Sequence, residues 1–421
     1  MSKIKHIFAR EILNSKGIPT VEVTILLENG VWATSSCPTG TSVSRYEAKE
    51  VRDSDRSRYA GLGVLAAVNN VKNVIAPKLQ GMDPQNQAQI DKLMIELDGT
   101  ADKQKLGVNA ILPVSMAVAK VAAKDLNTPL FKYLRHFLSI DPAKFKIPST
   151  AYNIINGGKH AGNNLDFQEF FVIPASSIEY PQALNMAVNI YQTLKRILHD
   201  KGMPTLVGDE GGFGPTFTAN RDGLLTIGEA IAAFGYRQNY EVYLGIDAAS
   251  NNFFDNGNYK IKDKEEPLSS KDLVEVYKAI NQEFNLLYLE DPMSEDDWDG
   301  WKMLNSSVSG NTMVIGDDLI STNPIRLQDA IAKNAIGGII VKPNQIGTVI
   351  ETLAVVEIAQ KSGLKIVVSH RSGDTNDDFI ADFAVGVGAD YVKFGAPSRG
   401  ERTAKYNRLL EIYSMVSGNT A

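Results

Sequence analysis

Charged and polar side chains follow six short apolar runs in the second half of the chain. The first three runs are EVYLGID, LLYLED and TMVIGDD, which end at Asp247, at Glu290 with Asp291, and at Asp317 with Asp318. The next three are GIIVK, KIVVSHRS and DYVK, which end at Lys342, at His370 with Arg371 and Ser372, and at Lys393. One such residue alone would indicate only a strand that meets solvent, but six in succession indicate a shared site.

The acids at the ends of the first three runs offer hard oxygen ligands. Asp247, Glu290 and Asp317 have no histidine or cysteine among them. Carboxylate oxygens favour Mg²⁺, whereas zinc prefers nitrogen or sulfur ligands. We therefore expect these three acids to hold a magnesium ion.

Lys342 ends the run that follows Asp317, so we expect it to project over the edge of the metal site. Nearby cations favour the neutral amine, which can act as a base that abstracts a proton. The alternative is a structural ion pair between Lys342 and one of the acids, since a buried lysine usually needs a partner.

Two acids from earlier in the chain could supply the opposite step of a reaction. Glu169 and Glu210 are expected on the first elements of the same fold. Two close carboxylates cannot both ionise cheaply, so one keeps a proton that could go to a leaving hydroxyl. Arg371 and Ser372 offer a fork of N–H donors and a hydroxyl that suit a phosphate. The combination favours metal-assisted β-elimination on a phosphorylated carboxylate.

The spacing of the runs predicts the elements that position these residues. Short β-branched runs bounded by Gly, Pro and polar residues are typical of buried strands. The intervals between them suit a helix and two loops, which predicts an α/β fold with a (β/α)8-type barrel. The stretches AYNIINGG and DFQEFFVIP, followed by helical patterns at 179–202 and 219–235, predict that the barrel opens ββαα.

A smaller α+β domain is expected before the barrel. TVEVTILLE and VWATSSC alternate like antiparallel strands and are joined at Asn29 and Gly30. Helical patterns follow at 63–79, 87–97, 107–126 and 129–138, with Pro113 predicting a kink or a late start. Prolines then interrupt the pattern, so we place an N-terminal capping domain at 1–138 and the barrel domain at 139–421.

Composition excludes several classes of protein. The chain has 421 residues and a formal net charge of −6, and it carries no basic run that would bind nucleic acid. The lone Cys37 excludes an intrachain disulfide. With no apolar signal core and no apolar stretch of about 18 residues, we expect a cytoplasmic protein without a membrane partner.

Several motifs resemble those of the enolase family, from one end of the chain to the other. They are AREILNSKGIPTVEV, NIINGGKHAGNNLDFQEF, VGDEGGF, GIDAAS, LEDP, GDDL, NQIG, SHRSGDT and GAPSRGERTAKYN. The resemblance implies reversible dehydration of 2-phosphoglycerate to phosphoenolpyruvate in glycolysis and gluconeogenesis. It also implies two Mg²⁺ per active site, a lysine base and assembly as a homodimer or homo-octamer.

The same resemblance implies a role for each candidate residue. The metal ligands would be Asp247, Glu290, Asp317 and Ser42. The catalytic set would be Lys342 as base on C2, Glu210 as acid, and Glu169 with His160 in support. The substrate-binding set would be Gln168, His370, Arg371, Ser372 and Lys393.

One loop departs from the family pattern and leaves two alternatives open. Val43 and Ser44 replace a Thr and a Gly, which predicts an effect on loop closure and second-metal affinity because glycine permits more backbone angles. The first alternative is a related hydratase or lyase that acts on a phosphonate analogue. The second is a non-catalytic role, as a scaffold in an RNA-processing complex or a plasminogen receptor, although the chain lacks a C-terminal lysine.

Overall fold

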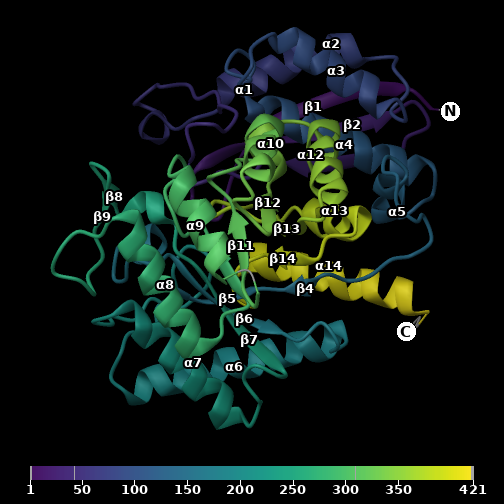
Figure 1. The fold of residues 1–421 in the computed structure, drawn as a ribbon. Helices are drawn as coiled ribbons and strands as arrows, with labels where there is room; N and C mark the ends of the chain where they lie inside the picture. The colour runs from purple at the N-terminus through teal and green to yellow at the C-terminus, as the bar shows by residue number, and fades with distance from the viewer. Residues whose placement is uncertain (1, 42, 309, 419–421) are drawn as a thin grey trace.

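The computed structural model describes residues 2–41, 43–308 and 310–418. A small N-terminal part of mixed strands and helices lies against a larger barrel (Figure 1). Backbone hydrogen bonds between Thr39 and Gly373 and from Ser15 to Asp374 join the N-terminal part to the loop after a barrel strand. The two parts therefore meet at the end of the barrel where its polar strand ends lie.

The N-terminal sheet is antiparallel, as predicted. Strand β1 (Ile4–Leu13) pairs with β2 (Pro19–Leu27), which pairs with β3 (Trp32–Ser36). Gly30 has a φ of 88° in the turn between β2 and β3, a conformation that glycine adopts readily. β1 is an additional strand that the sequence pattern did not single out, since its buried positions do not alternate regularly.

Helices cover one face of this sheet. Val21, Val23 and Ile25 of β2 are buried and share a core with helix α4 (Val108–Asp125). The other helices of this part are α1 (Leu65–Asn70), α2 (Ala76–Leu79), α3 (Gln87–Asp98) and α5 (Leu130–Arg135). The predicted helix at 63–79 is interrupted by a π-helical segment, Val71–Ile75, between α1 and α2. The helix α4 begins before Pro113, so it does not start late.

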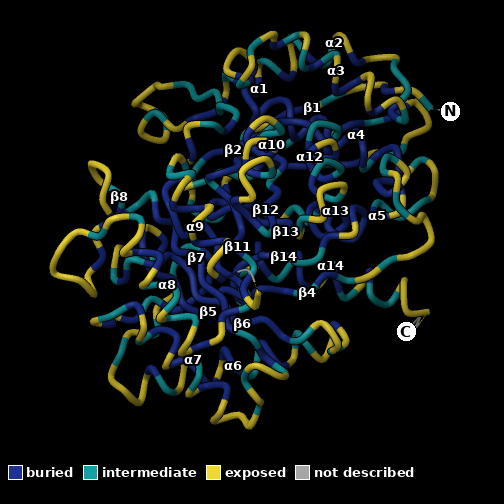
Figure 2. The backbone as a smooth tube through the Cα atoms, viewed as in Figure 1, coloured by how far each residue is buried: buried dark blue, intermediate teal, exposed yellow. Residues whose placement is uncertain are grey.

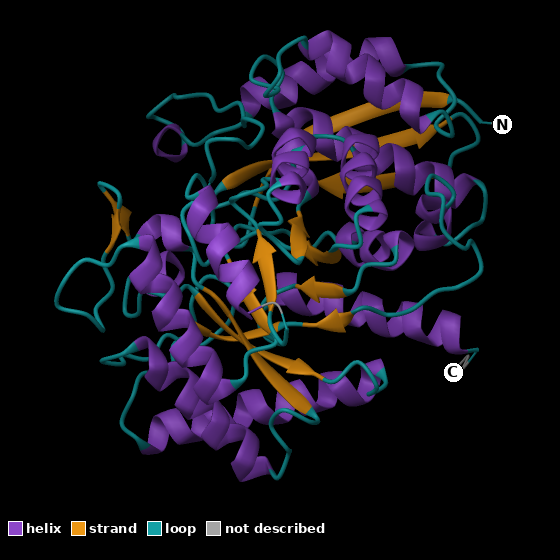
Figure 3. Ribbon diagram, viewed as in Figure 1, coloured by secondary structure: helices purple, strands orange, loops and turns teal. Residues whose placement is uncertain are grey.

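The barrel sheet closes through two short strands that follow each other in the chain. Its order is β4-β14-β13-β12-β11-β10-β7-β6-β5. The strands are β4 (Ser149–Thr150), β5 (Tyr152–Asn156), β6 (Glu169–Pro174), β7 (Val242–Asp247), β10 (Tyr288–Glu290), β11 (Met313–Gly316), β12 (Gly338–Val341), β13 (Lys365–Ser369) and β14 (Tyr391–Lys393). Only Ala151 separates β4, which pairs with β14, from β5, which pairs with β6, so the two behave as one strand and close the sheet (Figure 3).

The barrel opens in the predicted ββαα order. β5 and β6 are antiparallel, and helices α6 (Tyr180–Asp200) and α7 (Asn220–Phe234) precede β7. β6 and β7 are also antiparallel, whereas the described pairs from β7–β10 round to β14–β4 are parallel. The predicted α/β barrel is confirmed, and its parallel strands bring their carboxyl ends to one mouth.

Helices surround a buried sheet. They are α8 (Ser270–Phe284), α9 (Trp298–Val308), α10 (Pro324–Ala332), α11 (Pro343–Ile346), α12 (Val349–Lys361), α13 (Phe379–Val387) and α14 (Gly400–Ser417). The barrel strands are mostly dark blue in Figure 2, and the outer turns of the helices are exposed. A short hairpin of β8 (Phe254–Asp255) and β9 (Asn258–Tyr259) precedes α8. The described helices include none long and apolar enough to cross a membrane.

The connection between α5 and β4 contains no regular element among its described residues. The predicted domain boundary, between residues 138 and 139, falls in this connection and stays a prediction.

Candidate active site

The carboxyl ends of the barrel strands meet in one pocket. Eleven predicted site residues line it: His160, Gln168, Glu169, Glu210, Asp247, Asp317, Lys342, His370, Arg371, Ser372 and Lys393. Glu290 is not part of the lining but contacts Lys393 at 2.7 Å. Ser42, the remaining predicted residue, lies outside the described residues.

Asp247 and Glu290 are neighbours because β7 and β10 pair in parallel with these two residues opposite each other. Both side chains are buried. Burial raises the pKa of Asp247 to about 7, and burial together with the charge of Asp247 raises the pKa of Glu290 to about 8. Burial thus disfavours the charged form of both acids, and a divalent cation bound between them would stabilise that form.

Asp317 and Lys342 form an ion pair at the edge of this acid cluster. Gln345 Nε2 also donates to Asp317, at 3.2 Å. Burial raises the pKa of Asp317, but Lys342, Lys393 and Arg371 together outweigh burial and leave that pKa below its ordinary value. Burial lowers the pKa of Lys342, but nearby acids, chiefly Asp317 and also Glu290, leave it above its ordinary value. The ion pair that was the alternative interpretation of Lys342 is therefore present, and it places the amine beside a proposed metal ligand.

Two further acids belong to the same cluster. One carboxylate oxygen from each of Asp291, Asp317 and Asp318 lies within 4.8 Å of the others. Asp291 accepts hydrogen bonds at 2.8 Å from the backbone N–H groups of both Asp317 and Asp318. Burial raises the pKa of Asp318 to about 7. The doubled acids of LLYLED and TMVIGDD were the sequence signal for this pair, but strand ends alone could not show that Asp291 supports the next loop.

Lys393 lies at the centre of the carboxylates. Its Nζ is 2.7 Å from Glu290, 3.2 Å from Glu169 and 3.4 Å from Asp247. Burial lowers the pKa of this ammonium group, but the three acids together raise it well above its ordinary value. Lys393 is thus a positive charge fixed among the carboxylates that line the pocket.

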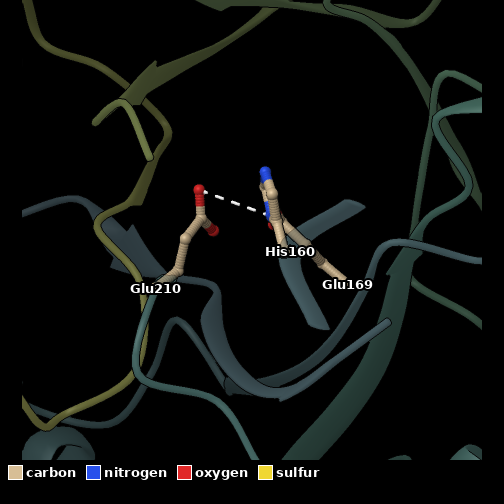
Figure 4. A group of neighbouring side chains, drawn as sticks. All are labelled: His160, Glu169 and Glu210. Atoms are coloured by element: carbon tan, nitrogen blue, oxygen red, sulfur yellow. Dashed lines mark ion pairs between the residues drawn. The ribbon is translucent and has the colours of Figure 1, made fainter. Parts of the chain in front are cut away.

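His160, Glu169 and Glu210 lie together in the same pocket (Figure 4). His160 Nδ1 lies 3.4 Å from Glu169 and 3.7 Å from Glu210. Burial and the charge of Glu210 raise the pKa of Glu169 well above its ordinary value. Burial also acts on Glu210, but His370 and His160 outweigh it, and its pKa lies well below the ordinary value. These opposite shifts fit a pair of close carboxylates in which a shared proton is favoured on Glu169.

His370 is neutral and oriented toward Glu210. Burial lowers the pKa of His370 to about 4. Arg402, which can only donate, lies 2.7 Å from His370 Nδ1, so the ring proton is on Nε2. That Nε2 lies 3.2 Å from Glu210. Arg402 was not predicted, since its buried side chain comes from a helix that the strand-end pattern does not include.

Arg371 is held by residues from both parts of the molecule. Its guanidinium donates to the Glu47 carboxylate at 2.8 and 3.2 Å and to Asn344 Oδ1 at 3.1 Å. Glu47 was not predicted, because it lies 324 residues from Arg371 in the sequence and in the other part of the fold. Ser372 lies beside Arg371, and its Oγ is 2.6 Å from the Thr41 hydroxyl.

Gln168 accepts a hydrogen bond at 3.2 Å from Asn252, which fixes its side chain at the pocket wall. The serine that replaces a family glycine is also well accommodated. Ser44 is not among the described non-glycine residues with a positive φ, so the backbone here does not require glycine. The predicted effect on loop closure and second-metal affinity stays a prediction.

Comparisons with known proteins agree with this geometry. The family model described as "Enolase, N-terminal domain" matches residues 4–134, and "Enolase, C-terminal TIM barrel domain" matches residues 144–421. A curated enolase from a Nitratiruptor species is 46% identical over 412 residues, which cover 98% of this chain and 96% of that relative. These similarities favour neither the phosphonate alternative nor the scaffold and receptor roles. The chain therefore belongs to the enolase family, and its activity is that of a phosphopyruvate hydratase.

Proposed function

We propose that this chain interconverts 2-phosphoglycerate and phosphoenolpyruvate with Mg²⁺, using Lys342 as base and Glu210 with Glu169 as acid. The observation that carries the proposal is that a lysine and a pair of close carboxylates line the same pocket. Lys342 is ion-paired with Asp317, and Glu169 and Glu210 lie together with His160. An elimination needs such an arrangement, because one proton leaves C2 while another must reach the departing hydroxide.

Asp247, Glu290 and Asp317 would hold the first magnesium ion. Their ligand atoms are buried carboxylate oxygens, which are hard donors of the kind that Mg²⁺ prefers. The raised pKa values of Asp247 and Glu290 indicate that burial leaves their charged forms in need of a positive partner. Bound Mg²⁺ supplies positive charge that stabilises the ene-diolate formed when C2 loses its proton. The second ion and its ligand Ser42 are part of the proposal by family resemblance.

Lys342 would take the C2 proton. In its present ion pair with Asp317 it is protonated, because Asp317 raises its pKa. A cation on the Asp317 carboxylate would offset that attraction and favour the neutral amine that a base requires. Lys393, already fixed among three acids, would hold the substrate carboxylate beside the metal.

Glu210 and Glu169 would supply a proton to the hydroxide that leaves the substrate. Asn153 Nδ2 donates to Glu210 at 3.0 Å, and His370 faces the same carboxylate, so Glu210 is oriented as an anion. The proton on Glu169 would pass through this pair to the leaving group, with His160 and Gln168 alongside. Arg371 and Ser372 would bind the phosphate, for which a guanidinium fork and a hydroxyl are suited.

A coupled assay for phosphoenolpyruvate formation tests this proposal. We expect turnover of 2-phosphoglycerate with Mg²⁺ and none after chelation, whereas negligible turnover with Mg²⁺ would refute it. We further propose a cytoplasmic location. We also propose that the chain forms a homodimer or homo-octamer, and light scattering on the purified protein can measure this oligomeric state.

A further inference from the structure

Tyr46 connects the N-terminal part to the loops around the acid cluster. Its ring centroid lies 3.7 Å from Cζ of Arg326, a buried residue of α10. Its hydroxyl donates to Asp296 Oδ1 at 2.8 Å. A guanidinium over an aromatic ring and a hydrogen bond to a carboxylate are both favourable, and both hold this one side chain.

Arg326 in turn joins two loops of the barrel. Its Nε donates to the backbone oxygen of Leu319, at 2.5 Å, in the loop that begins with Asp317. Its Nη2 donates to the backbone oxygen of Glu295, in the loop that follows β10. The guanidinium that packs on Tyr46 therefore also holds the loop that begins with Asp317 and the loop that follows Glu290, both of which are proposed metal ligands.

Neighbours of Tyr46 reinforce the contact. Ser44 Oγ donates to Glu295 Oε2 at 2.7 Å, and Arg45 Nε lies 3.2 Å from Glu295 Oε1. Glu47, directly after Tyr46, holds the guanidinium of Arg371. The segment 44–47 thus reaches from the loop after β10 to Arg371, the proposed phosphate-binding residue, and Tyr46 lies within this segment.

We propose that Tyr46 and Arg326 are positioning residues that clasp segment 44–47 onto the barrel and so set the place of Glu47 and Arg371. The clasp is the set Ser44, Tyr46, Asp296 and Arg326. It acts on the reaction only through the groups it holds, so this inference rests on the proposed function. Without the clasp, part of the population would have segment 44–47 undocked, and apparent affinities fall in proportion to the docked fraction.

The test combines proteolysis with kinetics. Trypsin cleavage after Arg45, followed by mass spectrometry, reports undocking without any substrate. Arg326→Met leaves the cleaved bond unchanged, and Tyr46→Ala removes the other half of the clasp. We expect both to speed this cleavage about tenfold and to raise the KM for 2-phosphoglycerate about five- to tenfold, with a smaller change in kcat. Tyr46→Phe, which keeps the ring, should recover most of both effects.

Tyr240 is the matched control. It also lies under a guanidinium, with Arg237 Cζ 4.0 Å from its ring centroid, but it is outside the pocket. Tyr240→Ala should leave cleavage and KM unchanged. Cleavage and KM within about twofold of the unaltered protein in both clasp variants would overturn the clasp. Faster cleavage with an unchanged KM would overturn its positioning role. Absent turnover in the unaltered protein would refute the proposed function, while proteolysis would still test the docking.

Discussion

Magnesium binding by this chain should depend steeply on pH, because two proposed ligands hold protons near neutrality. Burial raises the pKa of Asp247 to about 7, and burial with the charge of Asp247 raises the pKa of Glu290 to about 8. A carboxyl must lose its proton before it can bind the cation, so protons compete with Mg²⁺. Affinity should therefore rise as pH rises through both values.

The two ionisations give the magnitude. Near pH 6 roughly a tenth of Asp247 and a hundredth of Glu290 are ionised, whereas near pH 8.5 most of each is ionised. The product of the two ionised fractions rises about 10³-fold over this range, which corresponds to ~4 kcal/mol of binding free energy. Coupling with Lys393 and Asp317 will spread the transition without changing its direction.

Calorimetric titration of Mg²⁺ at several pH values, in buffers of different ionisation enthalpy, measures both the affinity and the protons released. Asp247→Asn should flatten the pH dependence. The matched control is Asp91→Asn, since burial also raises the pKa of Asp91 to about 7 but this residue lies outside the pocket. An affinity that changes less than about tenfold across the range, without proton release, would refute the assignment of Asp247 and Glu290 as ligands.

Three further outcomes are expected. Without added Mg²⁺, the free energy of unfolding in urea should fall as pH rises through about 7 to 8, and a rise with pH would contradict this. The reason is that the folded-state pKa values of Asp247 and Glu290 exceed the unfolded values of roughly 4. The stabilisation that these two carboxyls contribute is therefore complete only below the unfolded pKa values. Lys393→Met should cost ~3–5 kcal/mol at neutral pH by leaving buried carboxylates unpaired, and a loss below ~1 kcal/mol would show that the ammonium is not their counter-charge. Glu210→Gln should slow dehydration by about 10²-fold or more but still allow exchange of the C2 proton, so loss of both steps together would argue against separate acid and base roles.

Much of the site could be predicted from the regular alternation of strands and helices in the barrel. Once short apolar runs alternate with helices, their polar ends must share one mouth, and this brings Asp247, Asp317, Lys342 and Lys393 together without any knowledge of side-chain packing. The ββαα opening then brings Glu169 opposite Asp247 in the register of β6 and β7. These placements depend on backbone periodicity, which a sequence displays directly.

The contacts between the two parts of the molecule could not be predicted in this way. Glu47 pairs with Arg371, and Tyr46 stacks on Arg326, across long separations in sequence. Such pairs depend on how the N-terminal part docks on the barrel, and no local sequence pattern predicts this docking. The effect of Val43 and Ser44 on loop closure and second-metal affinity stays a prediction, although Ser44 is not among the described non-glycine residues with a positive φ.

The central claim is that Lys342 removes the C2 proton once cations are bound beside it. The most direct measurement is exchange of deuterium from solvent into C2 of 2-phosphoglycerate, with Mg²⁺, for the unaltered protein and for Lys342→Ala. We predict rapid exchange in the first and none in the second, with Mg²⁺ affinity largely retained. Exchange that persists in Lys342→Ala would contradict the account.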